Sequence, residues 1–504
     1  MIAYTPDDMH AADNITDMRI GIPITLLMGR AASALFDALS DHIGKHKKFV
    51  ILCGKGNNGG DGWALGIKLS EVHENVVCIP ITEVPSRGDP YFFYNMYISD
   101  GNGKTADVSE AEKELSDADV IVDAVFGTGF SGDIYRDSEF YSVIKYANST
   151  KAFRLAADIP SGADALTGKC ACIVFRADVT VTFAKPKIGM YSYPAREFCG
   201  KIIIADIGMP EQVFTGFDKK YEITDDDTVR SYIPKRADNS NKGTFGKLLV
   251  YAGSRDMTGA AHLALSGALR CGAGLVAFAS DAYVTDVMKR RLSEPVFLSV
   301  DDSDEDTDRL IDYSAKCSAL LIGCGLGNSE KIKKRVERLI RECNCPIILD
   351  ADGINAVSGN INIITEAGKG ILLTPHPLEF SRISGLSLDE VCDNRLFAAA
   401  EFARYYKCNI LLKGAGTVIA GSNGKVCINP IACSALAKGG SGDVLAGIIA
   451  SFAAQGASLY ESAVTGAYLH GRAGEALAEE YSEYGVLPSD IPACCARILA
   501  GLTR

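Results

Sequence analysis

The hydrophobic pattern of the first two hundred residues alternates short apolar runs with amphipathic stretches. Helical periodicity occupies residues 63–72 and 141–147. Nearly continuous apolar runs occupy residues 49–53, 75–81, 119–123, 154–158, 179–183 and 201–205. A strand that is apolar on both sides belongs in a sheet that helices cover on both faces. The alternation of strand-like and helical segments therefore predicts an α/β domain with a parallel, doubly wound sheet.

The pattern lapses into a polar stretch around residues 210–234 and then starts again. The new apolar runs are residues 247–251, 319–322, 346–349, 370–373 and 409–412. We place the boundary near residues 212–228, which predicts one domain over residues 1–215 and another over residues 228–504. The two halves share an architecture but no repeated motif, so the chain is read as a fusion and not as a duplication.

Composition narrows the class of protein. With 504 residues, 47% of them apolar and 23% charged, the chain suits an ordinary folded protein of several domains. A net charge of −12 argues against a nucleic-acid partner. The 16 cysteines include no Cys-x-x-Cys pair and several lie in apolar runs, which favours structural thiols. Without a signal peptide or a run of ~18 apolar residues, a cytoplasmic protein that does not span the membrane is expected.

A glycine-rich segment follows the first apolar run. Its sequence, from Gly54 to Gly62, is Gly-Lys-Gly-Asn-Asn-Gly-Gly-Asp-Gly, and a helix is expected from Trp63. Glycines let the backbone approach a phosphate, and the positive end of a helix dipole favours it. The same glycines also satisfy the common dinucleotide fingerprint, which is weak alone. Two asparagines in the turn, and a second strand ending at Glu83 in a proline-rich loop, argue against a plain dehydrogenase.

Two later strands end in aspartates that lead into further glycine-rich loops. Asp123 precedes residues 127–133, and Asp158 precedes Ser161 and Gly162. Ligands of open α/β sheets bind at the carboxyl ends of the strands, so these side chains are candidates for a site. The alternative is that each aspartate caps a helix or turn.

Together these segments resemble the NAD(P)H-hydrate epimerase family over about residues 10–210, with a Rossmann-like fold. The resemblance implies that Asp158 is the catalytic residue that faces the nicotinamide ring. It also implies a potassium ion held by Asn58, Asp123 and Ser161. Family contacts to the hydrated nucleotide would come from Asn57, Asn58, Gly59, Gly60, Asp61, Gly127, Thr128, Gly129, Phe130, Ser131, Gly132, Asp133 and Asp158. The family usually has Glu-Asn in its first helix, where this chain has Gly29 and Arg30.

The second half carries a different set of glycine turns. Residues 439–443 read Gly-Gly-Ser-Gly-Asp and open an apolar helix to about Gln455, so Asp443 would be a base beside an anion cradle. The alternative is a capped helix in which Asp443 only favours the dipole. Lys413 ends a strand before another glycine turn, but the spacing is not that of a Walker A motif. His376 also follows a strand and is a candidate ligand contact, although a lone loop histidine is the simpler interpretation.

These sequence segments resemble those of the ADP/ATP-dependent NAD(P)H-hydrate dehydratase family, which has a ribokinase-like fold, and the resemblance covers about residues 235–500. The resemblance implies that Asp443 is the catalytic base. It implies hydrate contacts from Ala260, Gly325, His376 and Asp443, and nucleotide contacts from Lys413, Gly414, Ala415, Gly416, Thr417 and Gly442. Where the family often has Asn, this chain reads Cys433-Ser434-Ala435.

The two resemblances together imply a repair enzyme for hydrated nicotinamide nucleotides. Its substrates would be the hydrates of NADH and NADPH (NADHX and NADPHX) and ADP, with ATP as the alternative phosphoryl donor. Its cofactors would be potassium in the first domain and magnesium in the second, and a homo-oligomer is expected. Two rivals stay open, namely a ribokinase-like vitamin or sugar kinase, and a non-catalytic nucleotide sensor.

Overall fold

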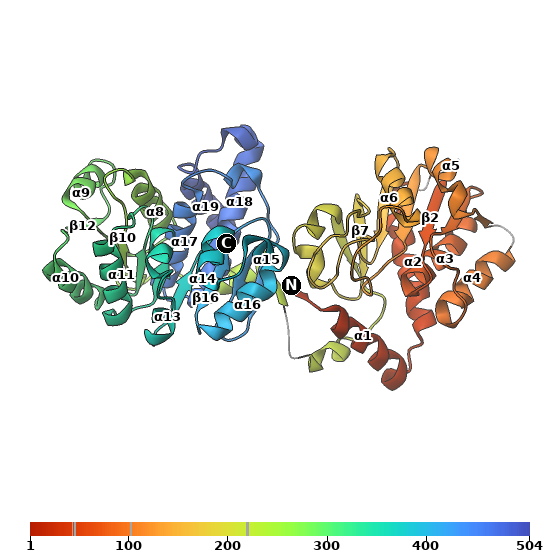
Figure 1. Cartoon of the computed structure of the whole chain (residues 1–504), viewed down its shortest axis with the longest axis horizontal. Coiled ribbons are helices and arrows are strands. Elements are labelled where there is room, and N and C mark those ends of the chain that lie inside the picture. Colours follow the sequence, from red (N-terminus) through yellow and green to blue (C-terminus); the bar gives the residue numbers. More distant parts are fainter. Residues whose placement is uncertain (43, 45–46, 101–102, 218–220, 504) are drawn as a thin grey trace. The chain divides into compact units, whose positions relative to one another are not determined.

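A computed structural model describes residues 1–503 except 43, 45–46, 101–102 and 218–220 (Figure 1). The chain divides into two compact units. One comprises Ile2–Tyr221, and the other comprises Met1 together with Glu222–Arg504. Each unit is described by itself below.

The first unit is built on a parallel sheet with the strand order β4-β3-β2-β5-β6-β7-β8. Alternate residues of β2 enter different cores. Phe49 and Ile51 pack with α2 and α3, whereas Val50 and Leu52 pack with α5 and α6. Helices therefore cover both faces, which explains why the strands are apolar on both sides. The sequence prediction of a doubly wound α/β unit is confirmed.

The strands of this unit are β1 (Ile2–Ala3), β2 (Phe49–Cys53), β3 (Val76–Pro80), β4 (Lys104–Thr105), β5 (Val120–Ala124), β6 (Phe153–Ala157), β7 (Val179–Phe183) and β8 (Lys201–Ala205). Its α-helices are α1 (Pro6–Ile15), α2 (Ile24–Ala38), α3 (Asn57–Ser70), α4 (Gly88–Asp100), α5 (Ala111–Ser116) and α6 (Glu139–Ser149). Short turns of other helix types are η1 (Thr16–Ile20), η2 (Ser40–His42), η3 (Val108–Glu110), η4 (Ile188–Tyr191), η5 (Ala195–Phe198) and η6 (Glu211–Gly216).

Helix α3 starts earlier than the sequence pattern indicates. It begins at Asn57, so residues 57–62 of the glycine-rich segment belong to the helix and are not a loop before Trp63. Close packing explains the glycines: a Cβ on Gly59 would lie 1.8 Å from the carbonyl oxygen of Gly54. The polar side chains of this segment are thus carried by a helix N-terminus.

The second unit is also built on a largely parallel sheet. From one edge the strand order is β12-β11-β10-β13-β14-β15-β16, all parallel, and then the antiparallel strands β17 and β18. Alternate residues such as Leu248 and Val250 pack against α8, α17 and α18 in one apolar core. Of the three consecutive antiparallel strands β16, β17 and β18, only β16 was predicted from the sequence.

The strands of this unit are β9 (Tyr221–Ile223), β10 (Lys247–Tyr251), β11 (Leu275–Ser280), β12 (Val296–Ser299), β13 (Ala319–Ile322), β14 (Ile347–Leu349), β15 (Ile371–Leu373), β16 (Asn409–Leu412), β17 (Thr417–Ala420) and β18 (Val426–Asn429). Its helices are α7 (Asp226–Tyr232), α8 (Thr258–Arg270), α9 (Ala282–Lys289), α10 (Asp304–Ser314), α11 (Glu330–Glu342), α12 (Asp352–Val357), α13 (Ile363–Glu366), α14 (Pro377–Ser384), α15 (Leu388–Asp393), α16 (Arg395–Tyr405), η7 (Ser434–Leu436), α17 (Ser441–Ala454), α18 (Leu459–Gly485) and α19 (Ile491–Leu502). Among the described residues, no helix is both long enough and apolar enough to cross a membrane.

Candidate active sites

The first unit contains a cavity of about 480 Å³ at the carboxyl ends of its strands. Its lining brings together segments that are distant in the sequence, including α1, the start of α3 and the loop after β5. Of the predicted contacts, those that line it are Asn57, Asn58, Asp61, Gly127, Thr128, Gly129, Phe130, Ser131 and Asp158. Gly59 and Gly60 are buried within α3, and Gly132 and Asp133 are exposed. Neither pair is part of the lining.

Asp158 lies directly after β6 in a strained backbone conformation, with φ of +66°. Its carboxylate forms an ion pair with Lys187 and accepts hydrogen bonds from the Thr182 hydroxyl (3.1 Å) and the Phe183 N–H (3.4 Å). Lys187 is itself 2% exposed and donates to the Thr182 hydroxyl and the Phe183 carbonyl. A left-handed aspartate persists only where its surroundings impose the conformation, and such strain is concentrated at functional sites. Lys187 was not predicted from the sequence.

Two other carboxyl groups line the same cavity. Burial raises the pKa of Asp13 to about 6, with Lys187 opposing this and Asp158 adding to it. Burial raises the pKa of Asp61 well above its ordinary value, and the charges of Asp158 and Asp13 act in the same direction. The cavity therefore holds a carboxylate paired with a lysine beside two carboxyl groups whose pKa values are raised, mainly by burial.

The three predicted potassium ligands converge near Phe126. Asp123 is fully buried and accepts hydrogen bonds from the backbone N–H (2.7 Å) and the hydroxyl (2.6 Å) of Ser161. The Ser161 hydroxyl also accepts from the Phe126 N–H at 2.8 Å. A Cβ on Gly127 would lie 3.6 Å from the side-chain oxygen of Asn58. Both side-chain polar atoms of Asn58 are buried without a hydrogen-bond partner.

That buried, unpartnered amide makes the cluster suitable for a cation. Buried polar groups are nearly always satisfied, so the Asn58 oxygen is available to a ligand. Amide, carboxylate and hydroxyl oxygens suit a hard monovalent ion. Burial raises the pKa of Asp123 to about 6, while its hydrogen bonds from Ser161 oppose this. A bound cation would favour the charged form.

In the second unit, Asp443 lies in the first turn of α17. The preceding Gly440 is left-handed, with φ of +102°, and a Cβ on Gly442 would lie 3.3 Å from the Lys413 ammonium. Burial raises the pKa of Asp443 to about 6, and the Asp350 carboxylate adds to this while Lys413 opposes it. Asp443 is thus a carboxyl group of raised basicity beside a glycine turn and a lysine.

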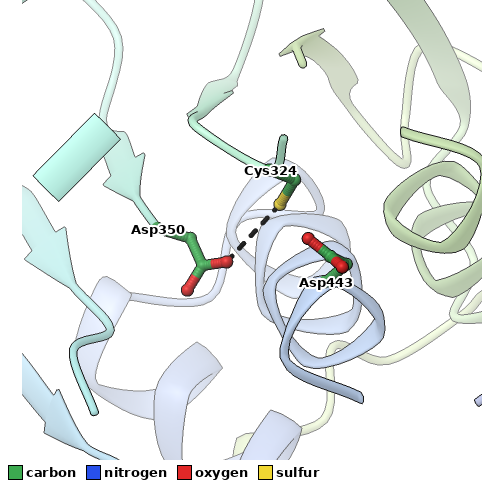
Figure 2. A group of neighbouring side chains, drawn as sticks. All are labelled: Cys324, Asp350 and Asp443. Atoms are coloured by element: carbon green, nitrogen blue, oxygen red, sulfur yellow. Dashed lines mark hydrogen bonds between the residues drawn. The ribbon is translucent and has the colours of Figure 1, made fainter. Parts of the chain in front are cut away.

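Figure 2 shows Asp443 and Asp350 on either side of the Cys324 thiol. Their candidate ligand atoms lie within 4.8 Å of one another. Asp350 is 2% exposed and accepts from the Lys413 ammonium (2.5 Å), the Thr374 hydroxyl (2.7 Å) and the Cys324 thiol (3.6 Å). This set does not suit magnesium, because Lys413 already neutralises Asp350 and magnesium prefers oxygen ligands to a thiol.

The loop that follows Lys413 is held by a residue that the sequence did not indicate. Arg395 donates to the carbonyl oxygens of Leu412 (3.1 Å), Lys413 (3.0 Å) and Ala415 (2.5 Å). A Cβ on Gly414 would lie 2.7 Å from this guanidinium. Burial lowers the pKa of Arg395 to about 10. The backbone of the predicted nucleotide segment Lys413–Thr417 is therefore held by the partly buried guanidinium of Arg395.

The remaining predicted contacts of the second unit lie in the first turn of α8 (Ala260) and after strands β13 (Gly325) and β15 (His376). A Cβ on Gly325 would lie 2.8 Å from that of Ala260, so these two residues are adjacent. His376 is the N-cap of α14, where its Nδ1 accepts from the Glu379 N–H at 3.3 Å. Its side chain is 49% exposed, which leaves the imidazole accessible.

Comparison with known proteins assigns the chain to a family. A family model described as NAD(P)H-hydrate dehydratase matches residues 248–496, and one described as YjeF-related protein N-terminus matches residues 25–189. The bifunctional NAD(P)H-hydrate repair enzyme Nnr of Moorella thermoacetica is 33% identical, over 97% of this chain and 95% of that protein. The enzyme of the same name from Coxiella burnetii is 32% identical, over 94% of each. The chain belongs to the family of bifunctional NAD(P)H-hydrate repair enzymes. The prediction of an epimerase fused to a dehydratase is confirmed.

Solved structures support the fold of the second unit. A ribokinase-like superfamily protein from Enterococcus faecalis is 25% identical, with a TM-score of 0.50, over 56% of this chain and 96% of that one. The ribokinase-like fold predicted for the second half is confirmed.

Two segments depart from the usual family pattern, namely Gly29-Arg30 and Cys433-Ser434-Ala435. Gly29 leaves open space, since a Cβ there would meet nothing within 4 Å. Arg30 donates to the Ile207 carbonyl oxygen at 3.2 Å, next to the cavity that Ile207 lines. Cys433 precedes the turn η7, in which Ala435 is buried.

Proposed function

We propose that the first unit interconverts the R and S hydrates of NADH and NADPH, and that Asp158 is an acid–base residue of this reaction. In the hydrate, the ring nitrogen is next to the carbon C6 that carries the hydroxyl group. Loss of water from C6 gives an iminium ion, and water then returns from either face. The ion pair of Asp158 with buried Lys187, in the cavity lined by both glycine-rich segments, is the observation that supports this most. We assign the activity to residues 1–215.

Potassium would be held by Asn58, Asp123 and Ser161. Its charge would complement the carboxylate of Asp123 and the phosphates of the substrate. The support is the buried, unpartnered oxygen of Asn58 beside the other two oxygen groups.

We assign residues 228–504 to the dehydration of the S hydrate at the expense of ADP, with ATP as the alternative donor. Asp443 takes the proton of the C6 hydroxyl as its oxygen attacks the terminal phosphorus of ADP, and AMP leaves. The ring nitrogen then expels phosphate, and loss of a proton from C5 restores NADH or NADPH. The raised pKa of Asp443 supports its role as a base near neutral pH. Magnesium would enter with the nucleotide phosphates.

The experiment is to give the full chain each purified epimer separately, with ADP, and to measure recovery of NADH. Both epimers should be consumed faster than they interconvert spontaneously, with one AMP formed per NADH. A small-molecule kinase would form a stable phosphorylated product and no NADH. A protein whose first unit only senses nucleotides would recover NADH from the S epimer alone.

A further inference from the structure

The cavity of the first unit holds more titratable groups than the proposed reaction uses. Those that line it are His10, Asp13, Lys55, Asp61, Asp158 and Lys187. Asp13 stands out because it comes from α1, outside the residues 25–189 that the family model matches. Its side chain nevertheless reaches the same cavity as Asp158.

Epimerisation at C6 requires a proton donor and a proton acceptor. The departing hydroxyl group must be protonated, and the water that attacks the iminium ion must lose a proton. Asp158 is paired with the Lys187 ammonium and accepts hydrogen bonds from Thr182 and Phe183, and all three contacts are made by its Oδ1 atom. The other oxygen, Oδ2, takes no part in these contacts and is the atom at which Asp158 would accept a proton. A second carboxyl group in the same cavity could then bring the proton.

The Asp13 carboxyl group has the properties of this donor. Burial raises its pKa to about 6, the charge of Asp158 adds to this, and Lys187 and His10 oppose it. Its side chain is only partly buried, so it can exchange its proton with water. Asp61 is also disposed to be neutral, but it is 8% exposed and therefore exchanges less readily.

We propose that Asp13 is a second acid–base residue of the epimerase site and shares one proton with Asp158. This inference rests on the proposed function of the first unit. Asp13 gives its proton to the C6 hydroxyl of one epimer, the C6–O bond breaks, and water leaves with the electron pair while the ring nitrogen forms the C=N bond. Water then adds to the other face of C6 and loses a proton to Asp158. The reverse reaction starts from the state in which Asp158 holds the proton, so atoms and charges balance in both directions.

The test uses the full chain and one purified epimer, without adenine nucleotide, and follows the appearance of the other epimer by chromatography. The kcat of the Asp13→Asn variant should be about 100-fold lower than that of the wild type, the scale of lost acid–base catalysis, and KM should be nearly unchanged. Its melting temperature should match the wild type, because the change keeps the shape of the side chain. Asp7→Asn, on the exposed surface of the same helix, is the matched control and should keep the wild-type rate.

The pH profile separates an acid–base role from a structural one. Wild-type kcat/KM should fall as pH rises through about 6, because the shared proton is then lost. This fall should be missing from the residual activity of Asp13→Asn. Suppose that Asp13→Asn keeps a near-normal rate and the wild-type pH profile while Asp158→Asn is inactive. This result would overturn the proposal that Asp13 and Asp158 share a proton and would leave the proposed function intact. Wild-type rates in both variants would instead contradict the proposed function.

Discussion

Both units place an aspartate beside a glycine turn and a lysine that is buried (Lys187) or partly buried (Lys413), but the lysine pairs with a different carboxylate in each. In the first unit Lys187 forms an ion pair with the candidate catalytic residue, Asp158. In the second unit Lys413 pairs with a neighbour, Asp350, and leaves the candidate base Asp443 with a pKa raised to about 6. The lysine therefore contacts the candidate catalytic carboxylate in the first unit and a neighbour of the candidate base in the second.

The difference agrees with what each reaction requires. Phosphoryl transfer to a hydroxyl group needs one base, and a lysine paired with Asp350 keeps that base free. Epimerisation needs a proton donor and a proton acceptor, and the ion pair with Lys187 holds Asp158 in place as one of the two. The cavity of the first unit then supplies a second carboxyl group, that of Asp13, from a separate element, α1.

The largest expected effect is that of Asp443→Asn on dehydration. Because the variant lacks the base, NADH formation from the S epimer should fall by about two to four orders of magnitude. The fold and ADP binding should be retained. Epimer interconversion by the same protein is the internal control and should be unchanged. Near-normal dehydration would mean that Asp443 only caps α17.

Asp158→Asn should abolish epimer interconversion and leave dehydration of the S epimer intact. Chromatography of a mixed-epimer substrate measures both. The change also leaves Lys187, which is 3% exposed in its side chain, without a charge partner, so we expect a loss of about 3 kcal/mol in unfolding free energy.

Pairing this change with Lys187→Met separates the two effects. The double variant should recover much of the stability, because no buried charge is left unpaired, while epimerase activity stays absent. Recovery of activity together with stability would show that Asp158 acts only through the fold.

The sequence predicts the strand ends and both aspartates, but not their partners. Asp158 and Asp443 are recognisable because each follows a glycine-rich or strand-end pattern. Lys187, Asp13 and Arg395 have no such pattern, and their roles depend on tertiary contacts across distant segments. The early start of α3 was missed for a related reason: its glycines are required by backbone packing in three dimensions, whereas local propensity disfavours them in a helix.

Asp350→Asn should move the pH dependence of dehydration without abolishing it. The negative charge of Asp350 raises the pKa of Asp443, and its removal also frees the charge of Lys413 to act on Asp443. Both changes lower that pKa, so activity should rise with pH about 1 pH unit earlier than in the wild type. Asp352→Asn is the matched control, since the charge of Asp352 has the weaker effect on Asp443. If the activity of Asp350→Asn rises with pH over the same range as that of the wild type, Asp350 does not influence the pKa of the catalytic base.

The smallest expected effect is the response of epimerisation to potassium. When potassium replaces a bulky organic cation at equal ionic strength, the epimerisation rate should rise about two-fold. Alternatively, the thermal stability of the first unit should rise by the amount that mass action gives a bound ion. Asp123→Asn should weaken this response, because the carboxylate that complements the cation is lost while the hydrogen bonds to Ser161 can remain. Asp137→Ala, in the exposed loop nearby, should respond as the wild type does.

Equal behaviour of the wild type in both salts would mean that water, and not a cation, satisfies the buried Asn58 side chain. Dehydration by the second unit should be indifferent to the exchange of cations, since Lys413 already supplies the positive charge beside Asp350.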